Sequence, residues 1–458
     1  MIHRIHVWFK QGYVDAPGES VRRKVHEHLG IALESVRIAD VFYIKGNLSA
    51  EQIDTLQQRL FTDPVVQESS SDGIIPLDFD WLIEVGYRPG VTDNVARTSL
   101  EGIADILGAE TASKISVFTS KKYLIKGHIS DGDAERIASG FLANSLIQRW
   151  RITSIEEWRK KSGTHLDIPE VHLHREASVR EINLNVSDDE LMRISREGIL
   201  ALELDEMKSI QKYFSDPEVV KERKKVGLGI NPTDVELEAL AQTWSEHCKH
   251  KIFNAEIEYT EESKTENIDS LFKTYIRCAT EKIAKKIDWL VSVFHDNAGV
   301  IKFNDKWNLV MKCETHNTPS ALDPYGGALT GIVGVNRDPA GTGIGCRLIF
   351  NTDVFCFAPP DYSGEIPPRL MHPKRVFDGV RMGVEHGGNK SGIPTVNGAI
   401  LFDDRYLGKP LVFCGTGGLM PAKVGKHPTW KKSARNGDAI IMTGGRIGKD
   451  GIHGATFS

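Results

Sequence analysis

One stretch of the sequence, Leu309–Asp338, carries residue types that could bind a nucleotide and move a proton. It reads LVMKCETHNTPSALDPYGGALTGIVGVNRD and places Lys312, Glu314 and His316 two residues apart at the end of an expected strand. Alternate side chains of a strand share one face, so we expect Lys312, Glu314 and, as a further candidate, His316 to project together. The side chains that should instead face a core are Leu309, Met311 and Cys313. A cation, a carboxylate and an imidazole would then converge, as binding a magnesium nucleotide and transferring a proton require.

Glycines follow these residues, and an Arg337-Asp338 pair closes the stretch. We expect a glycine-rich turn whose backbone could approach a phosphate chain. Its glycines are Gly326, Gly327, Gly331 and Gly334. Magnesium favours carboxylates together with substrate phosphates, so Glu314 and Asp338 are the natural metal ligands and Lys312 is the natural phosphate partner. The alternative is a tight turn in a β-rich domain.

His247 is the second residue considered for chemistry, in the segment SEHCKHK. A Thr233-x-x-Glu236 capping box predicts a helix that ends in this segment. The apolar face of that helix consists of Leu237, Leu240, Ala241, Trp244 and Cys248. A structural hydrogen bond is the commonest role for such a histidine. A nucleophilic pair with Cys248 is disfavoured because adjacent helical side chains do not meet, and zinc binding with Cys248 and His250 lacks the usual ligand spacing.

Length and composition indicate a soluble globular protein with several domains. The 458 residues suggest roughly three domains of about 150 residues each. A net charge of -5 provides no basic field for nucleic acid, and no apolar run is long enough for a signal peptide or a membrane span. Six cysteines without CxxC pairs argue against a zinc site or a disulfide scaffold and favour a reducing cytosol. The nearest approach to a GxxxxGK[ST] phosphate loop, Gly383–Ser391, has Asn389 in place of the lysine, so ATP binding would use another fold.

The first 150 residues contain a weak tandem repeat of about eighty residues. The segment Ile5–Gly30 aligns with Leu82–Gly108, and the later segment FYIKG aligns with YLIKG. The equivalent positions include Gly12 and Gly90, Asp15 and Asp93, and Gly30 and Gly108. Each copy is expected to form strand, turn, helix, strand and helix. Two small α+β units side by side are the simplest interpretation.

The segment from Arg151 to about Val186 is rich in charge and lacks periodicity, which predicts a linker or a surface wrap. His165, His172 and His174 lie in it, but no cysteine or acidic partner stands at ligand spacing. A solvated linker is therefore preferred over a metal site. At the other end, GDAIIMTGGRIGKDGIHGATFS begins a strand and a glycine turn and then stops, so we expect a domain that is cut off there. A natural terminus with a short final strand is the alternative.

Three ordered motifs together resemble phosphoribosylformylglycinamidine synthase, also called formylglycinamide ribonucleotide amidotransferase, an enzyme of purine synthesis. They are TWSEHCKHK (243–251), KCETHNTPSALDPYGGALTGIVGVNRD (312–338) and GGNKSGIPTVNGAILFDDRYLGKPLV (387–412). The tandem repeat resembles two fused copies of the family's small accessory subunit. The resemblance implies a cytoplasmic ligase that uses ATP and Mg²⁺ to amidate formylglycinamide ribonucleotide, with ammonia supplied by a glutaminase. It implies no nucleic acid or membrane partner.

The resemblance also implies roles for single residues. It implies catalysis by His247 and His316, and magnesium binding by Glu314 and Asp338. It implies nucleotide contacts for Lys312, His250, Gly327, Thr330, Gly331 and Gly334. It implies substrate contacts for Thr315, His316, Asn317, Thr318 and Arg337. Thr318 stands where many relatives have histidine and His250 where small-form relatives have tyrosine, and these two departures put the contacts of both positions in doubt.

The expected fold is a multidomain chain of the α+β and α/β classes. Its expected domains are two ferredoxin-like accessory repeats (1–79 and 80–155), a linker and helical region with the SEHC motif (156–265), an ATP-binding domain like that of aminoimidazole ribonucleotide synthetase (266–425), and the start of a C-terminal-type domain (426–458). Within the fourth of these we expect helices over 269–286 and 374–385, a strand over 350–357, and a second glycine-rich loop after 385.

Two other functions stay open. The chain could be a non-catalytic binding and assembly module, because the later motifs of the family and the cysteine nucleophile of its glutaminase have no counterpart here. It could also be another ATP-dependent enzyme of the aminoimidazole ribonucleotide synthetase superfamily, against which the SEHC motif and the N-terminal repeat count. The missing C-terminal half of the synthetase is the expected partner in the preferred interpretation.

Overall fold

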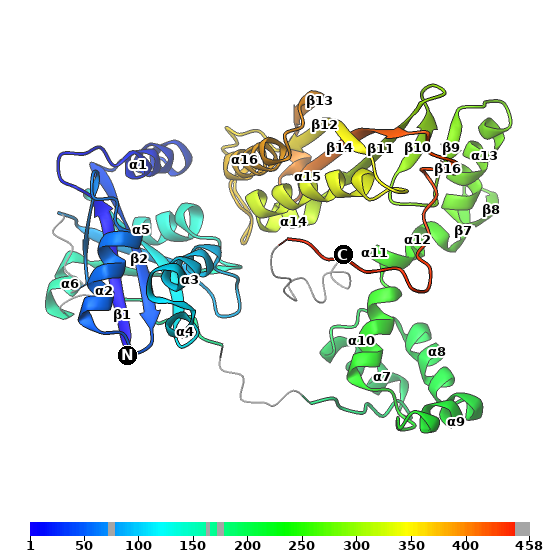
Figure 1. The fold of residues 1–458 in the computed structure, drawn as a ribbon, viewed down its shortest axis with the longest axis horizontal. Coiled ribbons are helices and arrows are strands. Elements are labelled where there is room, and N and C mark those ends of the chain that lie inside the picture. Colours follow the sequence, from blue (N-terminus) through cyan, green and yellow to red (C-terminus); the bar gives the residue numbers. More distant parts are fainter. Residues whose placement is uncertain (72–77, 162–164, 172–177, 445–458) are drawn as a thin grey trace. The chain divides into compact units, whose positions relative to one another are not determined.

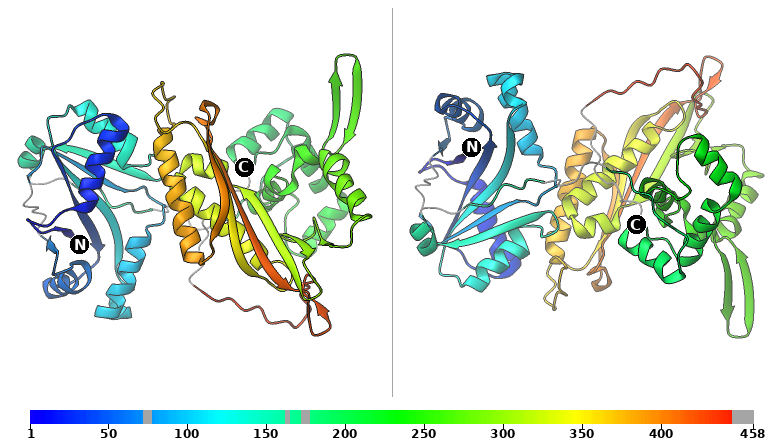
Figure 2. Two further views of the ribbon diagram at one scale, coloured as in Figure 1. Left: turned by 90° about the horizontal axis from the view of Figure 1, so that it is seen from above. Right: turned by 90° about the horizontal axis from the view of Figure 1, so that it is seen from below.

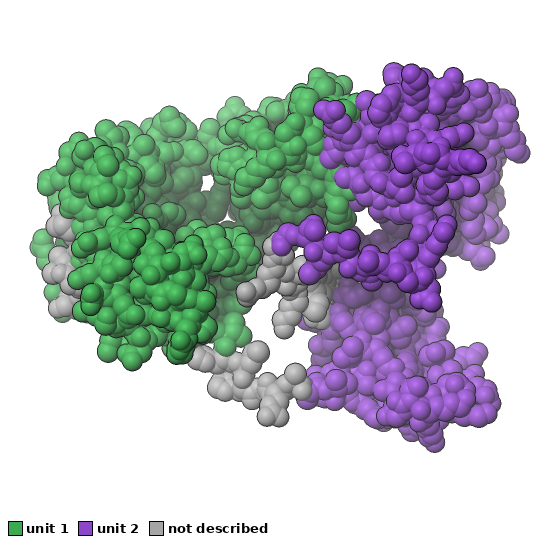
Figure 3. All heavy atoms as spheres, viewed as in Figure 1, with its two compact units in different colours: residues 1–172, 313–337, 349–416 green, residues 173–312, 338–348, 417–458 purple. Residues whose placement is uncertain are grey.

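A computed structural model describes residues 1–71, 78–161, 165–171 and 178–444 of the chain (Figure 1). It divides into two compact units (Figure 3). The first unit contains residues 1–172, 313–337 and 349–416, and the second contains 173–312, 338–348 and 417–458. None of the helices in the described ranges is long and apolar enough to cross a membrane.

The N-terminal part of the first unit consists of two copies of one pattern of elements. The first copy contains β1 (Ile2–Phe9), α1 (Ala16–Leu29), β2 (Ser35–Lys45), α2 (Ala50–Leu56), η1 (Gln57–Phe61) and β3 (Gln67–Ser70). The second contains β4 (Trp81–Tyr87), α3 (Asn94–Leu107), α4 (Ala109–Ala112), β5 (Ser116–Lys126), α5 (Asp131–Ile137), η2 (Ala138–Leu142) and β6 (Gln148–Ser154). The predicted strand-turn-helix-strand-helix repeat is confirmed, and each copy also ends in a strand that the sequence did not predict.

The aligned aspartates of the two copies make equivalent hydrogen bonds. Asp15 accepts a hydrogen bond from the backbone of Gly18 (2.8 Å) and Asp93 one from Ala96 (2.9 Å), so each caps the helix that follows. The second oxygen of Asp15 accepts from the backbone of Ile38 at 2.7 Å, and that of Asp93 accepts from the backbone of Thr119 at 2.8 Å. Each aspartate thus fixes its helix to the next strand.

The two copies share one six-stranded sheet, in the order β3-β1-β2-β5-β4-β6. The central pair, β2 and β5, are equivalent strands that run antiparallel over their full length. Apolar residues from both copies meet in the same cores: Ile5 and Ile44 pack with Ile103, and Val25 packs with Ile83. Neither copy encloses a core of its own, which is why the repeat must be double.

The second face of this sheet buries polar groups under the segment that follows β6. Lys122 and Glu84 lie 3.9 Å apart with almost no exposure. The backbone of Leu166 donates to Glu84, and His165 Nδ1 lies 3.1 Å from Lys122 Nζ. Burial lowers the pKa of His165 to about 3, so the ring is neutral. The described part of the predicted linker therefore wraps the sheet, whereas His172 and His174 lie outside the described residues.

The second unit begins with a helical cluster. It contains α7 (Asp188–Glu197), α8 (Leu204–Phe214), α9 (Pro217–Lys225) and α10 (Asp234–Thr243). The short helix α6 (Ile155–Lys161) precedes them in the first unit. The predicted capping box is confirmed, since Thr233 and Glu236 satisfy each other's backbone N–H groups. The helix it opens buries Leu237 and Ala241 but ends at Trp244.

A mixed sheet follows, in the order β13-β12-β14-β11-β10-β9. Its strands are β9 (Leu290–Ser292), β10 (Gly299–Lys302), β11 (Trp307–Thr315), β12 (Arg347–Phe357), β13 (Thr395–Phe402) and β14 (Leu411–Pro421). Around it lie α11 (Glu246–Lys249), α12 (Lys251–Asn254), β7 (Glu256–Glu261), β8 (Lys264–Asp269), η3 (Phe272–Arg277), α13 (Cys278–Ala284), η4 (Asp404–Tyr406), β15 (Lys423–Val424) and β16 (His427–Pro428). The predicted helix over 269–286 is thus η3 with α13, and the predicted strand over 350–357 lies within β12.

Three helices lie along one face of this sheet (Figure 2): α14 (Asn317–Leu322), α15 (Pro324–Ala340) and α16 (Pro373–Ser391). Ile332 of α15 and Val380 of α16 are fully buried against Phe357 of β12 and Val412 of β14. Because α16 continues to Ser391 and ends at Gly392 in the left-handed region, the glycine-rich loop predicted after 385 is wrong.

Candidate functional site

Side chains of strand β11, which leads into the motif, alternate between buried and exposed positions as predicted, but the buried positions are not the predicted ones. Asn308 and Val310 are buried, whereas Met311 is 48% exposed and Cys313 is also exposed. The prediction that Met311 and Cys313 face a core is therefore wrong, and Leu309 is only partly buried. Lys312 and Glu314 follow Val310 in the alternation, so these two side chains share its side of the strand, as predicted.

His316 stands directly after β11, at the N-terminus of α14. Its backbone N–H donates to Val412 of β14 at 2.8 Å, and its Nδ1 lies 2.5 Å from the carbonyl oxygen of Gly327. A carbonyl oxygen can only accept, so Nδ1 carries the hydrogen. In the neutral ring Nε2 then has a free lone pair, which is the arrangement that a general base needs.

Asn317 is held from the opposite strand. Its side-chain oxygen accepts a hydrogen bond from the backbone N–H of Val412 at 2.8 Å, which leaves its amide nitrogen to donate elsewhere. The Ser320 hydroxyl, fully buried, donates to the backbone oxygen of His316 at 2.6 Å. Val412 lies 95 residues beyond Asn317, and no spacing in the sequence points to it as a partner of the motif.

The glycines of the motif are helical, so the predicted glycine-rich turn is wrong. They belong to α15, and none of them has a positive φ. A Cβ atom on Gly327 would lie 2.4 Å from backbone atoms of Pro319 and Ser320, and one on Gly331 would lie 3.0 Å from His316. Two of these glycines therefore let α15 approach α14 and the histidine, while Gly334 has nothing within 4 Å of such a Cβ. Thr330 is exposed on the same helix.

In the second unit, Lys312 and Asp338 meet. Lys312 Nζ lies 3.0 Å from Asp338 Oδ2, and the Asp338 side chain is only 9% exposed. The pair joins the first charged residue of the motif to the last, 26 residues later. Carboxylates such as Asp338 and Glu314 are the hard oxygen ligands that magnesium prefers, and Mg²⁺ commonly takes only one or two from the protein and the rest from phosphates and water.

The remaining residues predicted to contact the substrate lie at the surface of the first unit. Thr315 ends β11, Thr318 lies in α14 and Arg337 lies in α15, and all three are exposed. Glu314 is also exposed. In the first unit the motif therefore presents a histidine, an asparagine, a carboxylate and a guanidinium on consecutive elements of one domain.

His247 belongs to the second unit, on a separate helix of one turn. Ser245 caps this helix through the backbone N–H of Cys248, so the prediction that Cys248 continues the apolar face of the preceding helix is wrong. His247, Cys248 and His250 are all exposed, and His250 has a φ of 53°. Among the described residues no group of three His, Cys, Asp or Glu side chains could hold a metal.

A buried hydrogen-bond network of asparagine, threonine and serine side chains holds α15 in place. Asn351 Nδ2 donates to Asn336 Oδ1 (2.8 Å), and the Thr416 hydroxyl donates to the same oxygen (2.6 Å). Asn336 in turn donates to Ser391 Oγ at 3.1 Å. Asn336 directly precedes Arg337, so two strands and α16 fix the helix at the position where the motif ends.

Asp353 lies two residues beyond Asn351 on β12 and gives a pH-dependent prediction. It is 6% exposed, one carboxylate oxygen has no hydrogen-bond partner, and burial raises its pKa. The native state then holds this proton more tightly than the unfolded state, so the unfolding free energy falls as pH rises from about 4 through the raised pKa. We expect Asp353→Asn to raise the unfolding free energy by on the order of 1–3 kcal/mol at pH 8, with a smaller gain near pH 4.

Denaturant titrations at several pH values measure this, with the exposed Asp404→Asn as the matched control that should change little. A gain that is equal at pH 4 and pH 8 would show that burial does not raise the pKa of Asp353.

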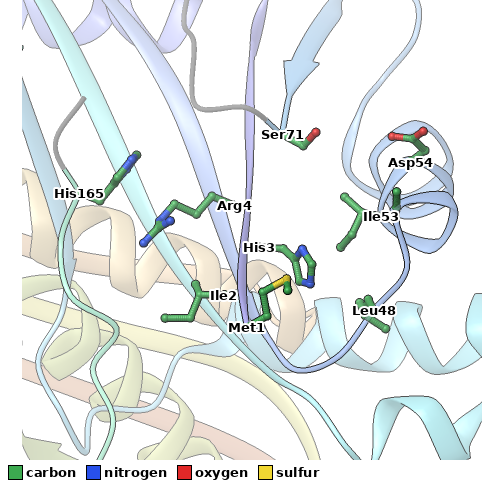
Figure 4. Close-up of a pocket in the computed structure, with 10 residues that line it drawn as sticks. Met1, Ile2, His3, Arg4, Leu48, Ile53, Asp54, Ser71 and His165 are labelled. Atoms are coloured by element: carbon green, nitrogen blue, oxygen red, sulfur yellow. The ribbon is translucent and has the colours of Figure 1, made fainter. Parts of the chain in front are cut away.

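One pocket in the first repeat lies apart from the motifs. Figure 4 shows its lining residues, which include His3 and Arg4 of β1, Ile53 and Asp54 of α2, and His165. Its volume is about 420 Å³. None of the residues to which the motifs give a catalytic, nucleotide, substrate or magnesium role lines it.

Comparisons with known proteins agree with the motifs. Residues 191–251 match the formylglycinamide ribonucleotide amidotransferase linker domain, and residues 295–420 match the AIR synthase related protein, N-terminal domain. The chain is 34% identical over 286 residues to phosphoribosylformylglycinamidine synthase subunit PurL of Thermoplasma volcanium, covering 62% of this chain and 32% of that relative. The corresponding subunit of Thermotoga maritima is 33% identical over 236 residues, covering 51% and 30%.

Among solved structures, T. maritima PurL complexed with ADP is 28% identical, with a TM-score of 0.30, and the match covers 44% of this chain and 26% of that one. The same protein complexed with FGAR is 27% identical, with a TM-score of 0.29, and the match covers 46% and 26%. The chain thus spans about a third of the length of the curated relatives it matches and contains a domain related to the AIR synthase N-terminal domain within a mixed α/β fold. These matches show that the chain is similar, in its linker and AIR synthase-related regions, to the phosphoribosylformylglycinamidine synthases.

Proposed function

We propose that the chain is the N-terminal portion of a phosphoribosylformylglycinamidine synthase. The whole enzyme would amidate formylglycinamide ribonucleotide with ATP and Mg²⁺, using ammonia from a glutaminase. The match of residues 295–420 to the AIR synthase-related domain carries this proposal, because it contains the Lys312–Asp338 motif. The match covers only about a third of such a relative, which supports the view that a C-terminal half completes the enzyme.

The geometry supports distinct roles for two groups of residues in the motif. Lys312 and Asp338 already form an ion pair, so the pair would open when Asp338 holds magnesium and Lys312 turns to the nucleotide phosphates. Glu314 is proposed as a magnesium ligand on the motif alone. Magnesium would supply charge neutralisation for the transferred phosphoryl group. In the first unit, His316 with a free Nε2 is suited to take a proton, and Asn317 and Arg337 are suited to hold the ribonucleotide.

The other predicted roles extend this proposal. His247 is proposed as the second catalytic histidine and His250 as a nucleotide contact, with both carried by the SEHC motif. Among the glycines, the helical positions of Gly327 and Gly331 favour a packing role over direct nucleotide contact. The two N-terminal copies are proposed to be ferredoxin-like accessory repeats, with the domain boundaries that the sequence predicts, and the chain is proposed to work in the cytoplasm.

A binding and assembly module is the second candidate function, because the chain spans only about a third of its relatives. In that case it would bind ligands without turnover until the rest of the synthetase is present. Formation of the amidine by the chain alone would rule this candidate out.

Titration calorimetry with MgATP tests the nucleotide end of the site. We expect Lys312→Ala to weaken MgATP binding about 10- to 100-fold, since a charge-assisted hydrogen bond contributes about 1.5–3 kcal/mol. The control is Lys306→Ala, which removes an exposed lysine just before the same strand and should leave the affinity unchanged. Equal affinities for the wild type and Lys312→Ala would exclude Lys312 as a phosphate ligand.

A further inference from the structure

Helix α14 is short, yet it carries the residues proposed to hold the ribonucleotide. It has six residues, begins next to His316 and contains Asn317. Helices of this length are not stable by themselves, and their last carbonyl groups have no partner within the helix. What holds α14 in place must therefore come from outside it. All residues discussed here belong to the first compact unit.

The N-terminal end of α14 is fixed to β14. Val412 accepts from the backbone of His316 and donates to the side chain of Asn317, both at 2.8 Å. This strand belongs to the same sheet as β11, so it accounts for one end of the helix only.

The C-terminal end is fixed by the second accessory-like repeat. Asn144, just after η2, donates from Nδ2 to the carbonyl oxygen of Leu322, the last residue of α14, at 3.0 Å. Asn144 is only 9% exposed. Its other side-chain atom accepts from the backbone of Leu146 at 3.1 Å, and its backbone N–H donates to Gln148, so the loop of the repeat sets the direction of the amide.

Arg375 of α16 makes a second connection at the same place. Its guanidinium donates to the backbone oxygens of Gly140 (2.8 Å) and Ala143 (2.9 Å), at the end of η2. The carboxylate of Asp323, the residue that follows α14, favours the charged form of this guanidinium. Two carbonyl groups at the end of η2 thus accept hydrogen bonds from the synthetase-like domain. In the other direction, one carbonyl group at the end of α14 accepts a hydrogen bond from the repeat.

We propose that the second repeat is a positioning element for the substrate end of the site, with Asn144 and Arg375 as positioning residues for His316 and Asn317. The part of this inference that concerns the ribonucleotide rests on the proposed function. The part that concerns the helix does not, because it follows from the contacts at the two ends of α14.

Hydrogen exchange of the full chain, followed by mass spectrometry, tests the role of Asn144. Asn144→Asp keeps the acceptor for Leu146 but replaces the donor to Leu322 with a carboxylate oxygen that the carbonyl repels. We expect the amides of residues 316–323 to exchange roughly tenfold faster, with no change in the strands of the repeats. The second variant, Arg375→Lys, should give a smaller effect in the same peptide, because lysine cannot reach both carbonyls as a fork.

Arg136→Ala is the matched control, since Arg136 also donates to a backbone oxygen, that of Leu29, but within the repeats. It should leave residues 316–323 unchanged. Unchanged exchange in Asn144→Asp, or an equal loss of protection throughout the repeats, would overturn the inference.

Ligand titrations of the same variants separate the inference from the proposed function. We expect Asn144→Asp to weaken formylglycinamide ribonucleotide binding about tenfold and to leave MgATP binding unchanged, because Lys312 and Asp338 do not lie on α14. A faster exchange with unaltered ribonucleotide affinity would overturn the role in substrate positioning. A wild-type chain that binds no ribonucleotide would contradict the proposed function, while the exchange result would still decide the role of Asn144.

Discussion

His316→Ala is expected to lower turnover by about 10²- to 10⁴-fold when the chain is joined to the C-terminal half that its relatives carry. The reason is geometric. The Gly327 carbonyl fixes the hydrogen on Nδ1, so Nε2 of the neutral ring can take a proton, and alanine leaves no group to do so. The measurement is the steady-state rate of ADP formation with ATP, formylglycinamide ribonucleotide and ammonium.

Two further variants separate catalysis from folding. His316→Asn retains an N–H donor near the position of Nδ1 and so can keep the bond to Gly327, but it has no base, and we expect it to be as inactive as alanine. His427→Ala removes a histidine that also contacts a backbone oxygen, that of Lys431, and it should retain full activity. Undiminished turnover in His316→Ala would remove His316 from the catalytic residues.

Gly327→Ala is expected to destabilise the protein by about 1–3 kcal/mol or more, while Gly334→Ala in the same helix should stabilise it by up to about 1 kcal/mol. A Cβ on Gly327 would lie 2.4 Å from the backbone of α14, which cannot yield as a side chain can. Gly334 has nothing within 4 Å, so alanine there only gains helix propensity. Denaturant midpoints of the two variants measure the difference.

The Gly327→Ala and Gly334→Ala variants also distinguish a packing role of the glycines from a role in phosphate binding. If they let α15 approach α14, Gly327→Ala should also lower turnover, because it displaces the helix that begins at His316, and Gly334→Ala should be fully active. If Gly334→Ala instead abolished MgATP binding at unchanged stability, the glycines would serve the phosphate chain, as the sequence alone suggested.

The N-terminal half was predictable because its signals are local. Asp15 and Asp93 cap helices, and Gly30 and Gly108 end them, so an alignment of two segments was enough to find both copies. The extra strands β3 and β6 were missed because QESS contains no apolar residue and QRWRITS contains only two. The shared cores of the two copies also could not be read from either segment alone, since they depend on the pairing of β2 with β5.

The candidate site was only partly predictable from the sequence. The predictions that failed there concern features that tertiary contacts determine. Apolar residues occupy both faces of β11, at Leu309, Val310 and Met311, so the period was right and the phase was not. The glycines suggested a turn because their reason for being small, the approach of α14, is absent from the local sequence. Helix α10 stops because Ser245 caps a new helix, although the apolar spacing continues through Cys248.

The central claim is that, within Leu309–Asp338, Lys312 and Asp338 bind a magnesium nucleotide while His316, Asn317 and Arg337 bind the ribonucleotide. The most direct test is ADP formation by the chain joined to its C-terminal half. We predict that ADP forms only when ATP, Mg²⁺, formylglycinamide ribonucleotide and ammonium are all present, and that Lys312→Ala and His316→Ala both lower its rate of formation at least tenfold at a limiting ATP concentration. ADP formation that is independent of the ribonucleotide, or equal in the wild type and both variants, would contradict the account.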